Sequence, residues 1–264
     1  MNDDASAPAA PSDQLTELRL ALGFLTILPV IDRRGMPEQT VAASFQWFPA
    51  IGLLMGIALA VEDWWLANFF GQTIRSVLII LTLTVVTGAV HLDGLADTAD
   101  ALGAGHDRER ALDILRDSRV GTFGASAIFF DLILKILALS TNTGHRAFTL
   151  SLAPMFARWA MLLVAAGLPY LRTNGAGSTL LSDDRPGLLA TMIMPGAIWV
   201  TIAVVILAVF QGATSPIVLP TVVTIAIVFA MRSFYRRWLG GVTGDLIGAC
   251  GELVEIAIFV MMAS

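Results

Sequence analysis

The sequence predicts an all-α, polytopic integral membrane protein that crosses the bilayer about seven times. Hydrophobic residues make up 56% of the 264 residues and charged residues only 14%, and the mean hydropathy is +0.76. Soluble domains rarely have this composition. Several apolar runs reach or approach the ~18 residues that a helix needs to cross the hydrocarbon core. These runs do not alternate polar and apolar residues, as the strands of a membrane β-barrel would.

The chain reads as one transmembrane domain, residues 15–264, that follows a polar tail, residues 1–14. The tail contains mostly Ala, Pro, Ser and Asp and is expected to be disordered. The first apolar stretch, Leu15–Val30, is short for a span, so we expect a re-entrant or interfacial helix there. The seven predicted spans are Phe45–Val61, Ser76–Val90, Thr122–Leu139, Phe148–Leu168, Leu188–Phe210, Ile217–Met231 and Leu246–Met262.

A charged amphipathic insert, residues 101–119, separates the second and third spans and is expected to form a cytoplasmic or interfacial helix. If the insert is cytoplasmic, eleven arginines lie in loops on that side of the membrane, and only Arg75 and Arg146 lie in the opposite loops. Cytoplasmic loops of membrane proteins carry an excess of basic residues. The sequence therefore predicts that residues 91–119 lie at the cytoplasmic face.

Three acids stand out in residues 91–100, which read His-Leu-Asp-Gly-Leu-Ala-Asp-Thr-Ala-Asp. Asp93, Asp97 and Asp100 lie within roughly 60° of one another on a helix, at about 100° per residue. Like charges on one stripe repel each other, and a bound cation would remove that cost. Carboxylate oxygens suit Mg²⁺, which commonly lies between carboxylates and substrate phosphates. The alternative is a solvated acidic first turn of a cytoplasmic helix.

A second polar segment, residues 116–124, reads Arg-Asp-Ser-Arg-Val-Gly-Thr-Phe-Gly at the start of the third span. Arginine side chains suit phosphate oxygens, and glycines let backbone N–H groups approach an anion at a helix N-terminus. Basic residues that anchor a span at the membrane surface would explain Arg116 and Arg119 equally well. They would not explain Asp117 or the glycines, so both interpretations stay open.

A third segment, Leu-Gly-Gly-Val-Thr-Gly-Asp at residues 239–245, follows Arg236 and Arg237. Asp245 could cap the last helix. It could also supply, with the neighbouring glycines and arginines, a second part of a phosphate–metal site.

Charged residues also lie inside the apolar runs. Asp131 and Lys135 are spaced to neutralise each other on one helix. Glu252 and Glu255 lie one turn apart in the last run, as a structural pair or as functional acids. Arg158 lacks a local partner and must reach an acid, a phosphate or the interface.

His91 does not share the face of the three acids. It could orient a ligand, act as a general base, or be a buried hydrogen-bonded histidine.

Other classes of site have little support. A single cysteine, Cys250, excludes internal disulfides and multi-cysteine metal sites. No basic patch with interleaved aromatic residues indicates nucleic-acid binding. Acids for Mg²⁺, arginines, and the lack of a Ser/His or Cys/His pair favour phosphoryl transfer on a diphosphate. The candidate residues are His91, Asp117 and Asp245 for catalysis; Asp93, Asp97 and Asp100 for metal binding; and Arg116, Ser118, Arg119, Gly121, Thr122, Arg158, Arg236 and Arg237 for substrate binding.

Five segments together resemble the cobalamin synthase family, also called adenosylcobinamide-GDP ribazoletransferase. They are Phe24–Val30 (FLTILPV), Phe48–Leu53 (FPAIGL), the acidic block at 91–100, Asp117–Thr122 (DSRVGT), and Gly244-Asp245. They occur in family order from about residue 17 to 255. Ile27 departs from the family pattern, in which a basic or polar residue is expected.

The resemblance implies an enzyme of the cell inner membrane with its active site on the cytoplasmic side. Its substrates would be adenosylcobinamide-GDP and α-ribazole, or α-ribazole 5′-phosphate. The ribazole 3′-hydroxyl would attack the cobinamide-bound phosphorus and GMP would leave. The oligomeric state stays open.

Two other functions compete with this one. A CDP-alcohol or prenyl-type transferase would also use acids and Mg²⁺, although the Asp-Gly-Leu-Ala-Asp order here lacks the arginine of the CDP-alcohol motif. A secondary transporter would use the charged residues inside the apolar runs, but it would show inverted repeats, and none is visible.

Overall fold

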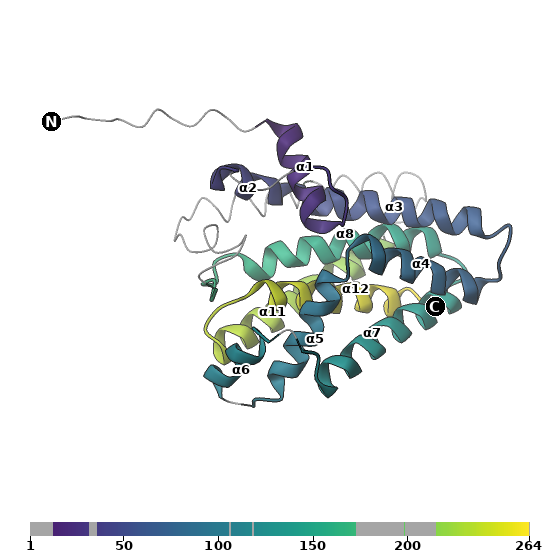
Figure 1. Ribbon diagram of the computed structural model, residues 1–264. Coiled ribbons are helices and arrows are strands. Elements are labelled where there is room, and N and C mark those ends of the chain that lie inside the picture. Colours follow the sequence, from purple (N-terminus) through teal and green to yellow (C-terminus); the bar gives the residue numbers. More distant parts are fainter. Residues whose placement is uncertain are drawn as a thin grey trace.

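The computed structural model describes residues 13–31, 36–105, 107–117, 119–172, 198 and 215–263, and these form a bundle of helices (Figure 1). The predicted all-α class is confirmed, because these ranges contain no β-strand and only one isolated bridge, between Tyr170 and Val242. The helices are α1 (Gln14–Leu25), α2 (Glu38–Ser44), the 3₁₀ helix η1 (Phe45–Trp47), α3 (Phe48–Leu66), α4 (Gln72–Val86), α5 (Val90–Leu102), α6 (Arg108–Ile114), α7 (Thr122–Thr141), α8 (Arg146–Ala165), α11 (Ser215–Trp238) and α12 (Gly244–Met261).

Four segments of the described chain are long and apolar enough to cross a membrane: Thr40–Leu66, Thr122–Thr141, Arg146–Ala165 and Val218–Trp238. The pair α4 and α5 meets the same criterion only when the two helices are counted together. The predicted span Leu188–Phe210 lies outside the described residues, apart from position 198. The structure thus supplies four or five candidate spans, and the count of seven stays a prediction.

The predicted span Ser76–Val90 ends early, because the chain turns at residues 87–89. Gly88 and Ala89 have φ angles of 62° and 54°, which no helix residue adopts. The Ala89 N–H donates to the Thr84 carbonyl over 2.9 Å, and the Ile27 N–H donates to the Val86 carbonyl over 2.9 Å. These bonds use carbonyls that the end of a helix leaves free. An 88° bend then separates α4 from α5.

The N-terminal stretch and the charged insert both form short helices. Asp13 caps α1, where its carboxylate accepts the Leu15 N–H over 3.2 Å, and residues 1–12 of the predicted tail lie outside the described residues. At 12 residues, α1 is too short to cross a bilayer. In the insert, α6 has seven residues, and Asp107 is the N-cap that precedes it.

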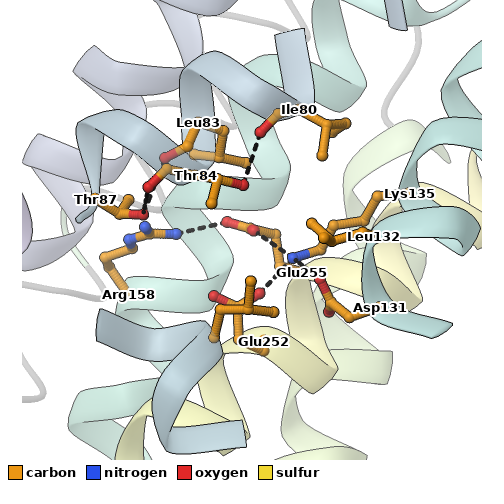
Figure 2. Close-up of a pocket in the computed structure, with 11 residues that line it drawn as sticks. Ile80, Leu83, Thr84, Thr87, Asp131, Leu132, Lys135, Arg158, Glu252 and Glu255 are labelled. Atoms are coloured by element: carbon orange, nitrogen blue, oxygen red, sulfur yellow. Dashed lines mark hydrogen bonds and ion pairs between the residues drawn. The ribbon is translucent and has the colours of Figure 1, made fainter. Parts of the chain in front are cut away.

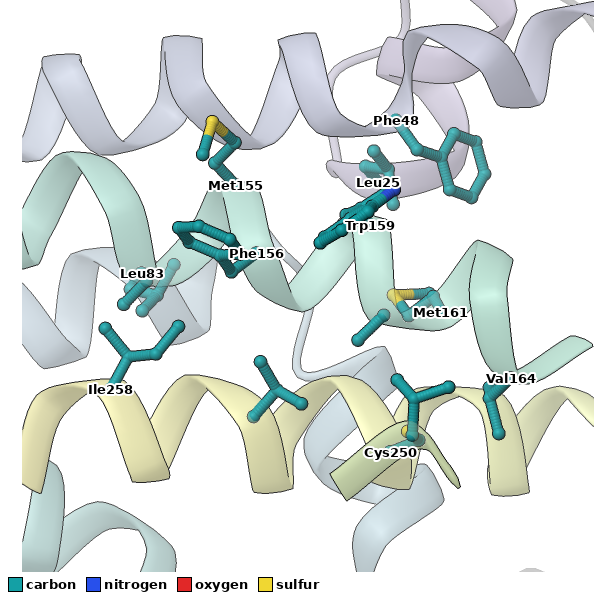
Figure 3. Packing of buried hydrophobic residues seen from close by; sticks show 14 of the residues in the cluster. Leu25, Phe48, Leu83, Met155, Phe156, Trp159, Met161, Val164, Cys250 and Ile258 are labelled. Carbon is teal, nitrogen blue, oxygen red and sulfur yellow. The ribbon is translucent and has the colours of Figure 1, made fainter. Parts of the chain in front are cut away.

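Helix α8 packs between α3 and α12 and forms the centre of the bundle. Figure 3 shows Met155, Phe156 and Trp159 of α8 among the side chains of its neighbours, with Cys250 fully buried on α12. The contact of α3 with α8 is unusually close, because Gly52 and Gly56 lie against the α8 backbone. A Cβ on Gly52 would stand 2.5 Å from the Pro154 carbonyl oxygen. This Gly-x-x-x-Gly spacing is typical of tightly packed membrane helices.

The two arginines predicted to lie opposite the cytoplasmic side meet at one end of the bundle. Arg75 and Arg146 both bind Asp63, with N–O distances of 3.2 and 2.5 Å. Arg108 and Arg172 instead bind the chain where α6, α11 and α12 meet, at the Leu239 carbonyl and at Asp245 respectively. These four arginines therefore lie at two ends of the bundle, and the orientation in the membrane stays a prediction.

The close approach of α3 and α8 generates a stability prediction. We expect Gly56→Ala to destabilise the protein by roughly 1–3 kcal/mol, several degrees of melting temperature, because the new methyl group would meet the backbone of Leu150 and Ser151. Gly71→Ala is the matched control, since a Cβ there has no atom within 4 Å. Thermal melts of both variants in detergent measure the effect, and equal melting temperatures would contradict it.

Candidate functional site

The acidic stripe of α5 lies against the first turn of α12. Gly94 makes this contact possible, since a Cβ there would stand 2.7 Å from the Asp245 carbonyl oxygen. Asp93 is exposed and Asp97 is half-buried. Asp97 interacts electrostatically with Asp93, Asp245 and Asp100, which repel it, and with Arg172, which attracts it. The structure therefore brings the predicted residue Asp245 to the predicted stripe.

Arg172 holds Asp245 in place. Its Nη2 donates to Asp245 Oδ2 over 2.5 Å and to the Leu115 carbonyl over 2.6 Å. The Thr243 hydroxyl also donates to Asp245 Oδ2, over 3.2 Å, and accepts the Leu246 N–H at the start of α12. Thr243, and not Asp245, is thus the cap of α12, and the carboxylate of Asp245 is left for the polar site.

Asp100 has a different environment from the other two acids of the stripe. Its carboxylate accepts the N–H groups of Gly121, over 2.6 Å, and Gly124, over 2.9 Å. A Cβ on either glycine would collide with this carboxylate. Asp100 therefore caps the start of α7 from a neighbouring helix. The N–H groups that the sequence offers to a phosphate are occupied by a carboxylate of the same chain.

The remaining acids fit a divalent cation by chemistry and charge. Asp93, Asp97 and Asp245 supply only oxygen ligands, and Arg172 balances one of their three charges. Within the described ranges, no three His, Cys, Asp or Glu side chains gather closely enough to surround a metal ion. Mg²⁺ commonly has one or two carboxylate ligands and completes its shell with water and substrate phosphates. An arrangement without a closed protein shell is compatible with that kind of site.

Arg116 and Arg119, two of the arginines predicted to bind phosphate, each pair with an acid near them in sequence. Arg119 contacts both oxygens of Asp117, with Nε–Oδ1 at 3.0 Å and Nη2–Oδ2 at 2.6 Å. These hydrogen bonds lower the pKa of the Asp117 carboxyl. Arg116 lies 3.3 Å from Asp113. Ser118 lies outside the described residues, and Thr122 is the exposed first residue of α7.

The other predicted residues divide between the surface and the interior. Arg236 and Arg237 are exposed in the last turn of α11. His91 is buried on α5 and packs against Gly248 of α12. Arg158 is 1% exposed and its Nη1 lies 2.5 Å from Glu255 Oε1, inside the bundle. The structure thus separates Arg158 from the acidic stripe.

The sequence pattern does not indicate Arg172 as a site residue. The parallel bridge between Tyr170 and Val242, with hydrogen bonds from Leu171 and Val242 N–H groups, brings the end of α8 next to the loop before α12. This contact joins segments about 70 residues apart, and no local pattern in the sequence indicates it.

Comparison with known proteins identifies the family of the chain. Residues 17–263 match the family described as cobalamin-5-phosphate synthase. A protein of Syntrophobacter fumaroxidans named adenosylcobinamide-GDP ribazoletransferase is 37% identical over 244 residues, 90% of this chain and 94% of its own length. Proteins of the same name from Pseudomonas putida strain F1 and Roseiflexus sp. are 38% and 34% identical, over 92% and 97% of this chain and 97% and 93% of their own.

No solved structure matches the chain. The family match nevertheless spans nearly all of it, including α5, the start of α7 and the start of α12. The chain belongs to the cobalamin-5-phosphate synthase family.

Proposed function

We propose that this chain joins adenosylcobinamide-GDP to α-ribazole, or to α-ribazole 5′-phosphate, with Mg²⁺ and releases GMP. The observation that carries the proposal is the position of Asp245 beside Asp93 and Asp97, with Arg172 bound to it. Phosphoryl transfer depends mainly on positioning and on neutralising charge, and an open cluster of carboxylates with an arginine bound to it can do both.

In this proposal Asp93 and Asp97 hold the metal ion, which offsets the negative charge of the diphosphate and of the leaving GMP. Asp245, held by Arg172 and Thr243, completes the acidic side of the site. Asp100 contributes less directly, because it fixes α5 to the first turn of α7. His91 keeps α5 against Gly248 and so positions the stripe over α12.

Arg116 and Arg119 are proposed to bind phosphate oxygens, together with Arg236 and Arg237. Arg119 already makes a two-pronged contact with the Asp117 carboxylate, which has nearly the geometry of a bound phosphate. Substrate would then replace Asp117 on the guanidinium. The freed carboxylate of Asp117 is the proposed acceptor for the proton of the attacking hydroxyl.

We place the protein in the cell inner membrane with this site on the cytoplasmic side. The support is the arginine distribution, with Arg75 and Arg146 gathered at the opposite end from Arg172. Large apolar side chains along the bundle remain exposed, such as Phe129 on α7 and Phe229 on α11, and we propose that they contact lipid.

A direct assay tests the function. Purified protein in detergent or proteoliposomes, given adenosylcobinamide-GDP, α-ribazole and Mg²⁺, should release GMP in step with formation of the corrinoid product. Chelating the metal should stop the reaction, and adding Mg²⁺ should restore it. Release of CMP or pyrophosphate from CDP-alcohol or prenyl diphosphate substrates, with no GMP from adenosylcobinamide-GDP, would contradict the assignment.

Replacement of Asp97 should lower activity without lowering stability. Asp97→Asn keeps the size of the side chain and removes a charge that the metal requires. We expect turnover at limiting Mg²⁺ to fall at least ~10–100-fold. Replacing a residue that only supports a metal ligand already causes a loss of this size. The melting temperature should stay level or rise, because repulsion with Asp93 and Asp245 is relieved.

The control is Asp113→Asn, an exposed acid on α6 that pairs only with Arg116 in the described part of the chain. Normal turnover of Asp97→Asn at low Mg²⁺ would remove Asp97 from the metal site.

Arg119→Lys tests the two-pronged contact. Lysine keeps the charge but cannot bind two oxygens in one plane. We expect kcat/KM to fall about tenfold, equivalent to one charged hydrogen bond of about 1.5 kcal/mol. Arg110→Lys, an exposed substitution on α6, serves as the control. If both variants behave like the wild type in steady-state kinetics, Arg119 has only an anchoring role.

A further inference from the structure

Five charged side chains meet inside the bundle, away from the acidic stripe. Asp131 and Lys135 come from α7, Arg158 from α8, and Glu252 and Glu255 from α12 (Figure 2). Each is at most 7% exposed. The Lys135 ammonium contacts all three acids, at 2.9 Å from both Asp131 Oδ2 and Glu255 Oε2, and also Glu252.

The charges in this cluster do not balance. Three carboxylates face two cations, which leaves one negative charge in an apolar interior. An uncompensated buried charge is very costly, so such groups take up or lose a proton instead. His91 is the other titratable side chain in electrostatic contact with the cluster. It does not supply the missing charge, because its burial disfavours a protonated imidazole, and the repulsion from Arg158 and Lys135 adds to this against the attraction of Glu255.

Asp131 is the acid with the weakest hydrogen bonding. Glu252 and Glu255 both accept hydrogen bonds from Lys135, and Glu255 also accepts one from Arg158. Neither carboxyl oxygen of Asp131 has a partner in hydrogen-bond geometry, although Oδ2 lies at ion-pair distance from Lys135.

A small cavity of about 10 Å³ adjoins Asp131, about the space of one water molecule. Helix α4 lines it with the hydroxyls of Thr84 and Thr87, and each hydroxyl donates its proton to a backbone carbonyl of its own helix. Both hydroxyl oxygens can therefore accept a hydrogen bond. A water molecule in this cavity would therefore find polar groups in its lining, as buried waters commonly do.

We propose that this cluster is a proton-binding site that holds one proton beyond its ion pairs. The proton is on Asp131, and its O–H donates to a water molecule in the adjoining cavity. The ligand is a proton rather than a metal cation, because Lys135 and Arg158 already place two positive charges at the cavity wall. The cluster is neutral with the proton bound, and it gains a full negative charge when the proton leaves.

Infrared spectroscopy tests the proposal directly, since a protonated carboxyl has a C=O stretch that a carboxylate lacks. The wild-type protein at pH 7 should show this band, and the band should shift in D₂O. Asp131→Asn should abolish it, and Asp113→Asn, which removes an exposed acid outside the cluster, should leave it in place. Absence of the band in the wild type, or its survival in Asp131→Asn, would overturn the assignment.

Stability against pH gives an independent measurement. The folded protein keeps the proton, whereas the unfolded chain releases it above the ordinary carboxyl pKa of ~3.9. Unfolding then releases one proton, so rising pH favours unfolding by up to about tenfold per pH unit. In Asp131→Asn, the free energy of unfolding should not show this fall between pH 5 and 8. At pH 5 it should equal that of the wild type.

Asp113→Asn, which removes an exposed acid, should keep the wild-type slope. An unchanged slope in Asp131→Asn would overturn the proposal. So would a loss of stability at pH 5 as large as that of Lys135→Met, because Asp131 would then be an ionised partner of Lys135.

Discussion

Contacts of Lys135 with three carboxylates hold the bundle together at its centre. Glu252 and Glu255 can remain inside an apolar bundle because Lys135 reaches them from α7 and Arg158 reaches Glu255 from α8. Removing one partner of a buried ion pair commonly costs roughly 3–5 kcal/mol. The same contacts fix α12 against α7 and α8, and the acidic stripe of α5 rests on the first turns of α7 and α12. The position of that stripe therefore depends on charges buried two turns or more along α12.

The sequence predicted most helices because the length of an apolar run and the position of its polar ends are local properties. Thr122–Leu139 agrees closely with α7, and Leu246–Met262 with α12. The apolar run Ser76–Val90 predicts one span, although α4 ends at Val86. Hydropathy does not detect the left-handed residues 88 and 89, since glycine and alanine are common within membrane helices. The Gly-x-x-x-Gly spacing at residues 52–56 is a signal that would have predicted the contact of α3 with α8.

The candidate site was predictable where one helix carries it and not where several helices meet. The spacing of Asp93 and Asp97 on α5 follows from the helix period, and the pairing of Asp131 with Lys135 follows from the same rule. Partners from distant segments follow no such rule. Nothing local indicates that Asp100 binds the α7 amides or that Arg172 binds Asp245. The sequence does not indicate the partner of Arg158, because Glu255 lies about 100 positions away.

The turn before α5 also restricts the number of residues that α5 can contain. At one end, the hydrogen bond of Ile27 with Val86 fixes the bend; at the other, Asp100 is fixed to Gly121 and Gly124. One added or deleted residue between these points would rotate the following residues by about 100° and shift them by about 1.5 Å. Asp97 and Asp100 could not then both keep their neighbours. Homologous chains should accept substitutions on the outer face of α5 far more readily than a change in its number of residues.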